Sequence, residues 1–236
     1  MTGVAFGERA AYLARHDALV LADPHVGRGE ASAVSLPLGE REDLVDRLGA
    51  LAARFDPATV VVAGDVVHTF DRVSDRSLGT LNALREVCDG VGAAFELVAG
   101  NHDVALQSAW EEPVREECVL DAGATRTVVC HGHEAPSTPA DRYVIGHVHP
   151  TIEIEGDRRP CFLRGEGVYR GADLLALPAF TRLSPGVAVN DMRTGAFDSP
   201  LVTDADRLAP VVVDSDAGEA GEPLRFPPLG EFRGLL

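Results

Sequence analysis

Short apolar runs, each followed at once by polar residues, set the pattern of the chain up to residue 150. Five of them, at residues 18–22, 59–63, 95–99, 126–130 and 143–145, consist mostly of apolar side chains. Apolar runs of this length, bounded by turn residues, are typical of strands that are buried on both faces. We therefore predict five buried strands, each of which ends in a polar cluster.

Two longer segments between these strands have the period of an amphipathic helix. Residues 40–55 and the segment after Ser74 each carry an apolar stripe at steps of three and four residues. The stripes consist of Leu44, Leu48, Leu51 and Phe55 in the first segment and of Leu78, Leu81, Leu84 and Cys88 in the second. Asp56-Pro57 closes the first helix, and Ser74 is the predicted N-cap of the second. These segments predict an α/β fold.

The pattern changes after Thr151. Short apolar runs separated by Gly and Pro predict short strands of a second sheet rather than further strand–helix units. These runs lie at residues 152–155, 161–164, 174–177, 187–189 and 210–213. In the first part of the chain, residues 4–13 predict an opening hairpin, residues 29–39 a loop with Pro37, and residues 104–110 a short helix.

One domain is the economical interpretation of a chain of 236 residues. Its hydrophobic content of 45% is enough for a sizeable core, and no linker, repeat or low-complexity segment interrupts it. We therefore expect a single domain over residues 1–236. The polar clusters occupy residues 23–149, and the second-sheet strands and C-terminal region occupy residues 151–236.

The charge balance is unusual. Asp and Glu number 37 against 21 basic residues, which gives a net charge of -16, and every basic residue is Arg. We interpret the acid excess and the absence of Lys together as adaptation to high intracellular salt, because salt screens the self-repulsion of an acidic surface.

This halophilic interpretation makes a direct prediction. Lowering KCl from molar to millimolar concentration should lower the midpoint temperature of thermal unfolding, because the surface carboxylates then repel one another over a longer distance. Circular dichroism at a series of KCl concentrations measures this. A midpoint that stays constant would contradict the interpretation.

The cysteines and the hydropathy of the chain predict the cellular compartment of the protein. The four cysteines are far apart and form no CxxC pair, so we expect buried small hydrophobes rather than a thiolate zinc site. No run approaches the roughly 20 apolar residues of a membrane span, and residues 1–11 lack the apolar core of a signal peptide. We expect a cytoplasmic protein with no membrane partner.

Polar residues that bind metals or move protons gather where the five predicted strands end. The clusters are Asp23/His25, Asp65/His68, Asn101/His102/Asp103, His131/His133 and His147/His149. Seven of the eight histidines lie in these clusters, and only His16 lies outside them. Because ligands of open α/β sheets bind beyond the carboxyl ends of the strands, we expect all five clusters to converge on one rim.

The residue types of these clusters suit divalent metal ions. Carboxylate, imidazole and amide oxygen fit Mn²⁺, our first expectation, and also Fe²⁺, Zn²⁺, Ni²⁺ or Mg²⁺. The ligands are too many for one ion, and Asp65 is the natural carboxylate to bridge two. Two ions about 3.5–4 Å apart can clamp the attacking and the leaving oxygen of a phosphoryl displacement.

The sequences DPH, GDVVH, GNHD, HGH and GHVH, in this order between Asp23 and His149, resemble the five motifs of the calcineurin-like metallophosphoesterases. The opening ADPHVGRG and the loop to Pro37 resemble the archaeal phosphoesterases related to SbcD-type nucleases and the bacterial ligase-associated repair phosphoesterases. The resemblance implies a four-layer α/β/β/α sandwich of two mixed sheets flanked by helices. Pro24 departs from the family pattern, which has another residue type there.

The resemblance also implies a role for each matching residue. The first metal would be held by Asp23, His25, Asp65 and His149, and the second by Asp65, Asn101, His131 and His147. Asp65 would bridge the two ions together with a hydroxide that attacks phosphorus in line. His102 would protonate the leaving oxygen or stabilise charge on the phosphoryl group, and Asp103 would orient His102.

Three further residues are candidates for substrate contact. Arg28 follows the first motif and is either a phosphate contact or a solvated loop residue. His68 is either a support of the metal ligands or a simple loop residue. His133, two residues after His131, is expected to support a ligand or to face the substrate rather than to bind metal.

The leading functional hypothesis is a dinuclear metal-dependent hydrolase of phosphodiester or phosphomonoester bonds. One alternative is a DNA-repair-associated nuclease. The sequence has no Arg-rich stripe that would support binding of nucleic acid, and its acidic composition does not exclude such binding. Another is a non-catalytic scaffold with the same fold, although the retained His102 argues against it. A homodimer is left open.

Overall fold

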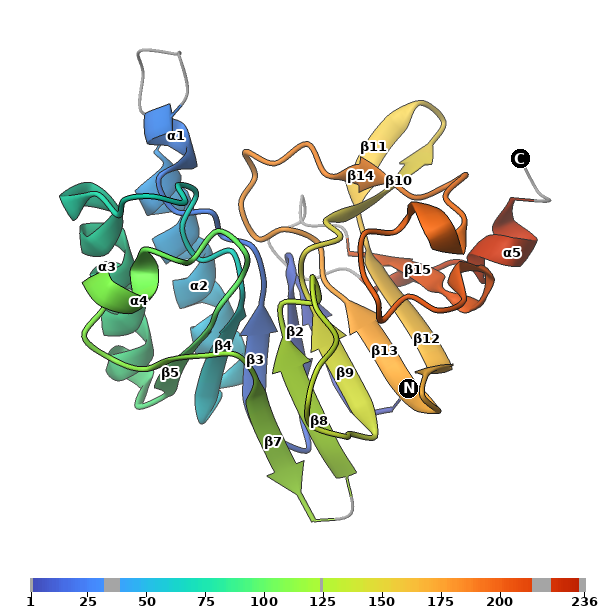
Figure 1. Ribbon diagram of the computed structural model, residues 1–236, viewed down its shortest axis with the longest axis horizontal. Coiled ribbons are helices and arrows are strands. Elements are labelled where there is room, and N and C mark those ends of the chain that lie inside the picture. The colour runs from blue at the N-terminus through green and yellow to red at the C-terminus, as the bar shows by residue number, and fades with distance from the viewer. Residues whose placement is uncertain (1, 32–38, 124, 214–221, 234–236) are drawn as a thin grey trace.

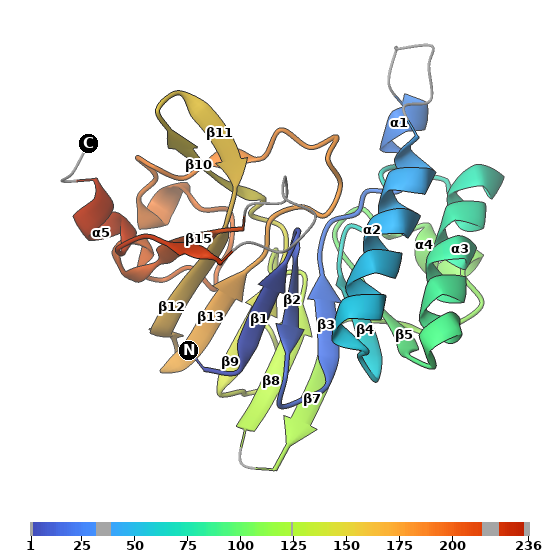
Figure 2. The ribbon, with the colours of Figure 1, turned by 180° about the vertical axis from the view of Figure 1, so that it is seen from behind.

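Two large β-sheets lie face to face in the computed structural model, which describes residues 2–31, 39–123, 125–213 and 222–233 (Figure 1). The long helices α2 (Glu40–Phe55) and α3 (Asp75–Val91) lie side by side on the outer face of the first sheet (Figure 2). Short elements cover the outer face of the second sheet. The layers therefore follow the expected four-layer order.

The first sheet is built from the N-terminal half of the chain. Its strands, in spatial order, are β1 (Val4–Gly7), β2 (Ala10–Leu13), β3 (Ala18–Leu21), β4 (Thr59–Ala63), β5 (Ala94–Val98) and β6 (Val114–Arg115). The first three pair antiparallel, and β3 to β6 run parallel. Consequently β3, β4 and β5 deliver their carboxyl ends to one edge.

The second sheet begins earlier in the chain than expected. Its spatial order is β16 (Leu224–Arg225), β15 (Ala209–Val212), β12 (Phe162–Tyr169), β13 (Ala172–Ala176), β9 (Arg142–Ile145), β8 (Thr125–Cys130) and β7 (Cys118–Ala122). Strands β8, β9 and β13 run parallel. The boundary expected at Thr151 is wrong, because the two motif-bearing strands β8 and β9 belong to this second sheet, where β8 pairs with β7 and β9, and β9 pairs with β13.

A third, small sheet accounts for two of the predicted short strands. It consists of β11 (Asp157–Pro160), β10 (Pro150–Ile154) and β14 (Val187–Ala188). The short helix α1 (Arg28–Ala31) starts the segment expected to be a loop, and residues 32–38 with Pro37 lie outside the described residues. Helix α4 spans only Leu106–Ala109, a single turn of the predicted helix.

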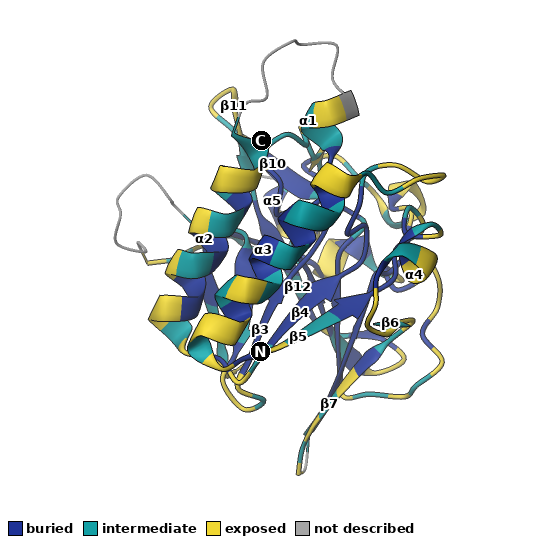
Figure 3. Cartoon of the chain, turned by 90° about the vertical axis from the view of Figure 1, so that its left-hand side faces the viewer, coloured by how far each residue is buried: buried dark blue, intermediate teal, exposed yellow. Residues whose placement is uncertain are grey.

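The helix boundaries follow the predicted signals. Ser74 caps α3, since its Oγ accepts a hydrogen bond from the backbone N–H of Ser77 at 3.0 Å. Asp56 ends α2 in the left-handed conformation with φ 45°. Figure 3 shows both helices with buried residues toward the sheet and exposed residues outward, as the apolar stripes require.

Successive side chains along the strands of the first sheet point to opposite faces of the sheet, which divides the interior into two layers. Leu19, Val60 and Leu97 pack with the helices, whereas their neighbours Val20, Val61 and Val98 pack against the second sheet. The outer face of the second sheet is covered by the 3₁₀ turns at Thr194–Ala196 and Ala205–Arg207 and by α5 (Leu229–Phe232). The fourth layer thus consists of short turns instead of long helices. Among the described helices, none is long and apolar enough to cross a membrane.

Candidate metal centre

The five polar clusters meet at one edge of the two sheets. The loops after β3 and β4 are joined by hydrogen bonds from the N–H of Asp23 to Gly64 O at 3.1 Å and from the N–H of His25 to Asp65 O at 3.0 Å. Gly146 N–H, after β9, donates to His131 O, after β8, at 3.0 Å. The rim therefore belongs to both sheets, and not to a single open sheet as the sequence suggested.

Asp23 lies fully buried at the centre of the rim and links the two sheets. Its Oδ1 is 3.0 Å from Nε2 of His131, and its Oδ2 is 3.3 Å from Nε2 of His149. The backbone N–H of His147 donates to Oδ2 at 2.9 Å. Burial alone would raise the pKa of Asp23, but His149 and His131 outweigh it and hold that pKa below its usual range.

Asp65 faces the imidazoles of both sheets. Its Oδ2 is 3.6 Å from Nε2 of His131, 3.7 Å from Nε2 of His102 and 3.9 Å from Nε2 of His25. Its Oδ1 accepts a hydrogen bond from the backbone N–H of His102 at 3.1 Å. One carboxylate oxygen is thus anchored to the backbone, while the other is directed into a ring of imidazoles.

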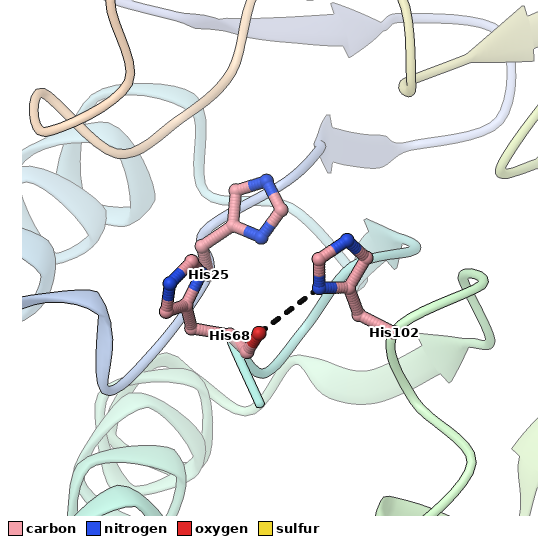
Figure 4. Close-up of side chains that lie close together, drawn as sticks. All are labelled: His25, His68 and His102. Carbon is pink, nitrogen blue, oxygen red and sulfur yellow. Dashed lines mark hydrogen bonds between the residues drawn. The ribbon is translucent and has the colours of Figure 1, made fainter. Parts of the chain in front are cut away.

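Three imidazoles from the first sheet lie together on one side of Asp65. Figure 4 shows His25, His68 and His102, whose ring centroids are 5.3–6.2 Å apart. Nδ1 of His102 is hydrogen-bonded to the backbone O of His68 at 2.9 Å. A carbonyl oxygen only accepts, so Nδ1 carries the hydrogen and Nε2 is free to face the site. Burial lowers the pKa of His25 to about 3, which keeps its imidazole neutral.

Asp103 does not orient His102, and this expectation is corrected. Its carboxylate is buried and accepts three backbone hydrogen bonds, from Val66 and Val67 at 3.0 Å each and from Gly100 at 2.7 Å. The carbonyl of His68 holds His102 instead. Burial raises the pKa of Asp103 to about 6, and the three N–H donors oppose that shift. Asp103 therefore fastens the loop after β5 to the loop after β4.

Replacement of Asp103 by Asn should destabilise the protein. An amide group has one acceptor oxygen where the carboxylate has two, so at least one buried N–H loses its partner, at a cost of about 1–3 kcal/mol. Urea unfolding of the metal-free variant measures this. Asp121→Asn, which removes an exposed carboxylate paired with Arg126, is the control and should change stability by less than about 1 kcal/mol. Unchanged stability of Asp103→Asn would contradict the fastening role.

The second sheet supplies the remaining histidines. His131 is buried, and its Nδ1 is 3.0 Å from Nδ1 of His133. Burial would lower the pKa of His131, but the hydrogen bond and charge of Asp23 raise it overall. The ring of His147 lies 4.8 Å from that of His131. His133 contacts His131 and, within the described ranges, belongs to none of the groups of potential metal ligands.

Asn101 differs from the other predicted ligands, whose carboxylates and imidazoles are partly or fully buried. Its side chain is exposed and, among the described residues, makes no hydrogen bond. Arg28 lies close enough for its charge to lower the pKa of His25 and His68, in each case after burial as the main cause. Its backbone N–H donates to Oε1 of Glu40 at 3.0 Å.

The backbone of the rim is strained at five site residues. The φ angles of Asp23, His25, Asp65, His147 and His149 lie between 44° and 65°, a region that residues with a Cβ rarely adopt. Such strain gathers at functional sites, where the surrounding structure must hold it. It directs side chains from both sheets toward one point.

Two glycines make the approach of these loops feasible. A Cβ at Gly146 would lie 2.6 Å from Oδ2 of Asp23, and a Cβ at Gly100 would collide with the backbone N and the carboxylate of Asp65. The loops after β9 and β5 can therefore touch the two central carboxylates only because these positions lack a side chain.

The donor set fits divalent cations. Three groups have potential ligand atoms that all lie within 4.8 Å of one another: Asp23/His25/His149, Asp23/Asp65/His131 and His25/His68/His102. Among the described residues, Nδ1 and Nε2 of His25, Nδ1 of His68 and Nε2 of His149 are buried and have no hydrogen-bond partner. Buried polar atoms without a partner are costly, and a bound cation would supply the missing interaction.

Sequence reasoning missed three residues that touch this cluster. The ring of Phe70 stacks on His102 at a centroid distance of 3.8 Å and is itself 53% exposed. Oγ of Ser184 is 3.3 Å from Nδ1 of His149, and Oδ2 of Asp198 is 3.7 Å from Nε2 of His147. Phe70 follows His68 by two residues in the loop after β4, whereas Ser184 and Asp198 reach the rim through the packing of distant loops, and no motif marks any of the three.

Comparison with known proteins identifies the family of the chain. Residues 17–185 match the calcineurin-like phosphoesterase family. The structure is similar to that of the nuclease MPE from Pseudomonas putida, with a TM-score of 0.61 and 25% identity over 92% of each chain. The phosphoesterase YfcE from E. coli has a TM-score of 0.46 and 16% identity, over 89% of this chain and 98% of its own. No curated protein sequence matches the chain. Since the family match covers more than half of its length, the chain belongs to the calcineurin-like phosphoesterase family.

Proposed function

We propose that the protein is a dinuclear metal-dependent hydrolase of phosphoester bonds, with phosphodiesters as the first expectation and phosphomonoesters as the second. One observation carries the proposal: the ligand groups Asp23/His25/His149 and Asp23/Asp65/His131 adjoin each other, since Asp23 belongs to both and Oδ2 of Asp65 lies 3.6–3.9 Å from His131 and His25, one imidazole of each group. Adjoining groups of carboxylate and imidazole are what a pair of divalent ions requires.

The residues divide between two ions as follows. Asp23, His25 and His149 would hold the first, together with Asp65. Asp65 would also hold the second, with His131, His147 and Asn101. The position of Asp65 Oδ2, within 3.6–3.9 Å of imidazoles from both groups, supports its role as the bridge. Mn²⁺ is the expected ion, with Fe²⁺, Zn²⁺, Ni²⁺ and Mg²⁺ as alternatives. When bound, the ions would neutralise phosphoryl charge and supply hydroxide near neutral pH.

His102 is the proposed catalytic acid. Its Nδ1 hydrogen is committed to the carbonyl of His68, so Nε2 alone can exchange a proton with a substrate. In the imidazolium form, Nε2 carries a proton that it can donate to the leaving oxygen, or a hydrogen bond that it can give to the phosphoryl group. Arg28, His68 and His133 are proposed to support or contact the phosphoryl group. The carbonyl of His68 contributes by fixing the ring of His102.

Metal removal tests the proposal. The chelated protein should not hydrolyse bis-p-nitrophenyl phosphate or p-nitrophenyl phosphate in molar KCl, and added Mn²⁺ should restore activity. Because a ligand that binds only the folded state stabilises it by about 2.7 kcal/mol at a hundred times its dissociation constant, Mn²⁺ should also raise the unfolding midpoint. Mn²⁺ binding without turnover of either substrate would contradict the enzymatic proposal and favour the scaffold alternative.

A nuclease is the second candidate, and one observation favours it. The similarity to the nuclease MPE extends over 92% of both chains at 25% identity. Assays on single-stranded and nicked duplex oligonucleotides, with Asp65→Asn as the inactive control, decide this point. Cleavage that is equal in both proteins would indicate a contaminating nuclease.

A further inference from the structure

A cavity of about 300 Å³ opens directly beside the proposed metal centre. Its lining includes Arg9, Thr151, Arg158 and Ser184, together with His149. His149 belongs to both features, since its Nε2 faces Asp23 at 3.3 Å and its Nδ1 faces Ser184 Oγ at 3.3 Å. The cavity is therefore one imidazole away from the proposed first metal.

Arg9 is held in the wall of this cavity by the backbone. Its Nη1 donates to the carbonyl of Ala179 at 3.1 Å and to that of Thr181. Burial, followed by the positive charges of Arg47 and Arg182, lowers the pKa of Arg9 to about 10, although Asp43 and Glu8 oppose the shift. The guanidinium is thus fixed in place, remains charged at neutral pH, and lies in surroundings that favour an added negative charge.

Arg158 also lines the cavity. It lies on β11, opposite Glu153 of β10, and its side chain is exposed. In the part of the chain that the structure describes, it makes no hydrogen bond or ion pair. Figure 1 shows the β10–β11 hairpin and the long loop between β13 and β14 above the edge at which β3 and β9 end. Two guanidinium groups from elements about 150 residues apart in sequence therefore converge on one cavity.

These positive charges contrast with the rest of the molecule. The net charge of -16 repels polyanions, so an anionic substrate needs a local reversal of potential at the site. Guanidinium groups bind phosphate oxygens through paired N–H donors, and the Ser184 hydroxyl can donate as well. The cavity is within the size range of small-molecule sites.

We propose that this cavity binds a second phosphate of the substrate. A single linking group joins this phosphate to the phosphate that is hydrolysed. The proposal rests on the proposed phosphoesterase function and narrows its substrate class to compounds with consecutive phosphates, such as a nucleotide chain. A simple diester, which has a single phosphate, leaves the cavity unused.

The test compares substrates that differ only in a terminal phosphate. The Mn²⁺-loaded protein is assayed at one KCl concentration with the dinucleotide TpT and with its forms phosphorylated at the 5′ or the 3′ end. We expect one phosphorylated form to have a kcat/KM about tenfold above that of TpT, mostly through KM, because a charge-assisted hydrogen bond to the added phosphate contributes about the 1.4 kcal/mol to which a tenfold change corresponds. The preferred end identifies the side of the scissile bond that the cavity serves.

Arg158→Gln should reduce this ratio to about one, whereas Arg159→Gln should preserve it. Arg159 is the neighbouring residue on the same strand, so the control removes the same charge from the other face of the hairpin. The proposal is overturned if the terminal phosphate gives no advantage or if the advantage persists in Arg158→Gln. It is also overturned if Arg158→Gln weakens inhibition by inorganic phosphate to the same extent with every substrate. The cavity would then be a site for free phosphate and not for a second phosphate of the substrate.

Failure of the underlying function has a different signature. If the metal-loaded protein hydrolyses neither bis-p-nitrophenyl phosphate nor any of the dinucleotides, the phosphoesterase proposal itself is wrong. Turnover of the simple diester without discrimination among the dinucleotides overturns only the second-phosphate site.

Discussion

Asp65→Asn should abolish phosphoester hydrolysis and weaken metal binding without unfolding the protein. The substitution preserves shape, and the Asn oxygen can still accept the hydrogen bond that Oδ1 of Asp65 receives from the N–H of His102. What changes is the other oxygen, which makes no hydrogen bond to any residue that the structure describes and lies 3.6–3.9 Å from three imidazoles. An amide nitrogen at that position has no lone pair for a cation.

The expected loss is large because Asp65 is the proposed common ligand of both ions. Removal of groups that merely orient metal ligands already weakens metal binding by about 10–100-fold, so loss of a shared ligand should exceed about a hundredfold. Calorimetric titration of the metal-free protein with Mn²⁺ measures the affinity. Hydrolysis of bis-p-nitrophenyl phosphate measures the activity.

Asp198→Asn is the matched control for this change. Asp198 is an exposed carboxylate 3.7 Å from His147, so its removal takes the same charge from the same rim. The side chain of Asp198 is fully exposed and lies beyond hydrogen-bond distance, so it does not orient the His147 ring, and we expect metal affinity within about threefold of the wild type. If Asp65→Asn binds Mn²⁺ as tightly as Asp198→Asn does, the assignment of Asp65 as the bridge is wrong.

Local signals in the sequence predict the first half of the fold well. The apolar stripe over residues 40–55 and the cap at Ser74 depend on neighbours within a few residues, and the structure has α2 at Glu40–Phe55 and a capped α3. Strand β4 lies at Thr59–Ala63 as predicted. By contrast, nothing near Cys130 or Ile145 indicates that their strands join the second sheet, in which β8 pairs with β9 and β9 pairs with β13, because strand pairing depends on distant partners.

The candidate site, like the fold, has features that the sequence predicts and features that it does not. Its residues follow strand ends, so the sequence predicts which side chains gather at the rim. It does not predict their connections. The assignment of Asp103 to His102 fails because the donors to Asp103 come from Val66 and Val67, 36–37 residues earlier in the chain. Likewise, Arg9 and Arg158 carry no motif, and only the packing of β11 and of the loop before β14 brings them to one cavity.

His102→Ala should retain both metals and lose most of the turnover. The side chain of His102 is proposed to act on the leaving oxygen, so its removal leaves the ligands Asp23, Asp65 and His131 in place. Since a positioned acid contributes about 10²–10⁴-fold, kcat should fall by that factor for the dinucleotide TpT, whose alkoxide leaving group needs a proton, and by much less for bis-p-nitrophenyl phosphate, whose leaving group needs little protonation. A leaving group that needs no proton should reduce the loss, which separates proton donation from a purely structural role.

His68→Ala provides the contrast to His102→Ala. The structure holds His102 through the backbone carbonyl of residue 68, which alanine retains, so the ring should remain oriented and kcat should fall by much less. A defect in His68→Ala as large as that of His102→Ala would require the His68 imidazole itself to act on the substrate. Loss of Mn²⁺ binding in His102→Ala would instead make His102 a ligand in the group with His25 and His68, and would overturn its assignment as the acid.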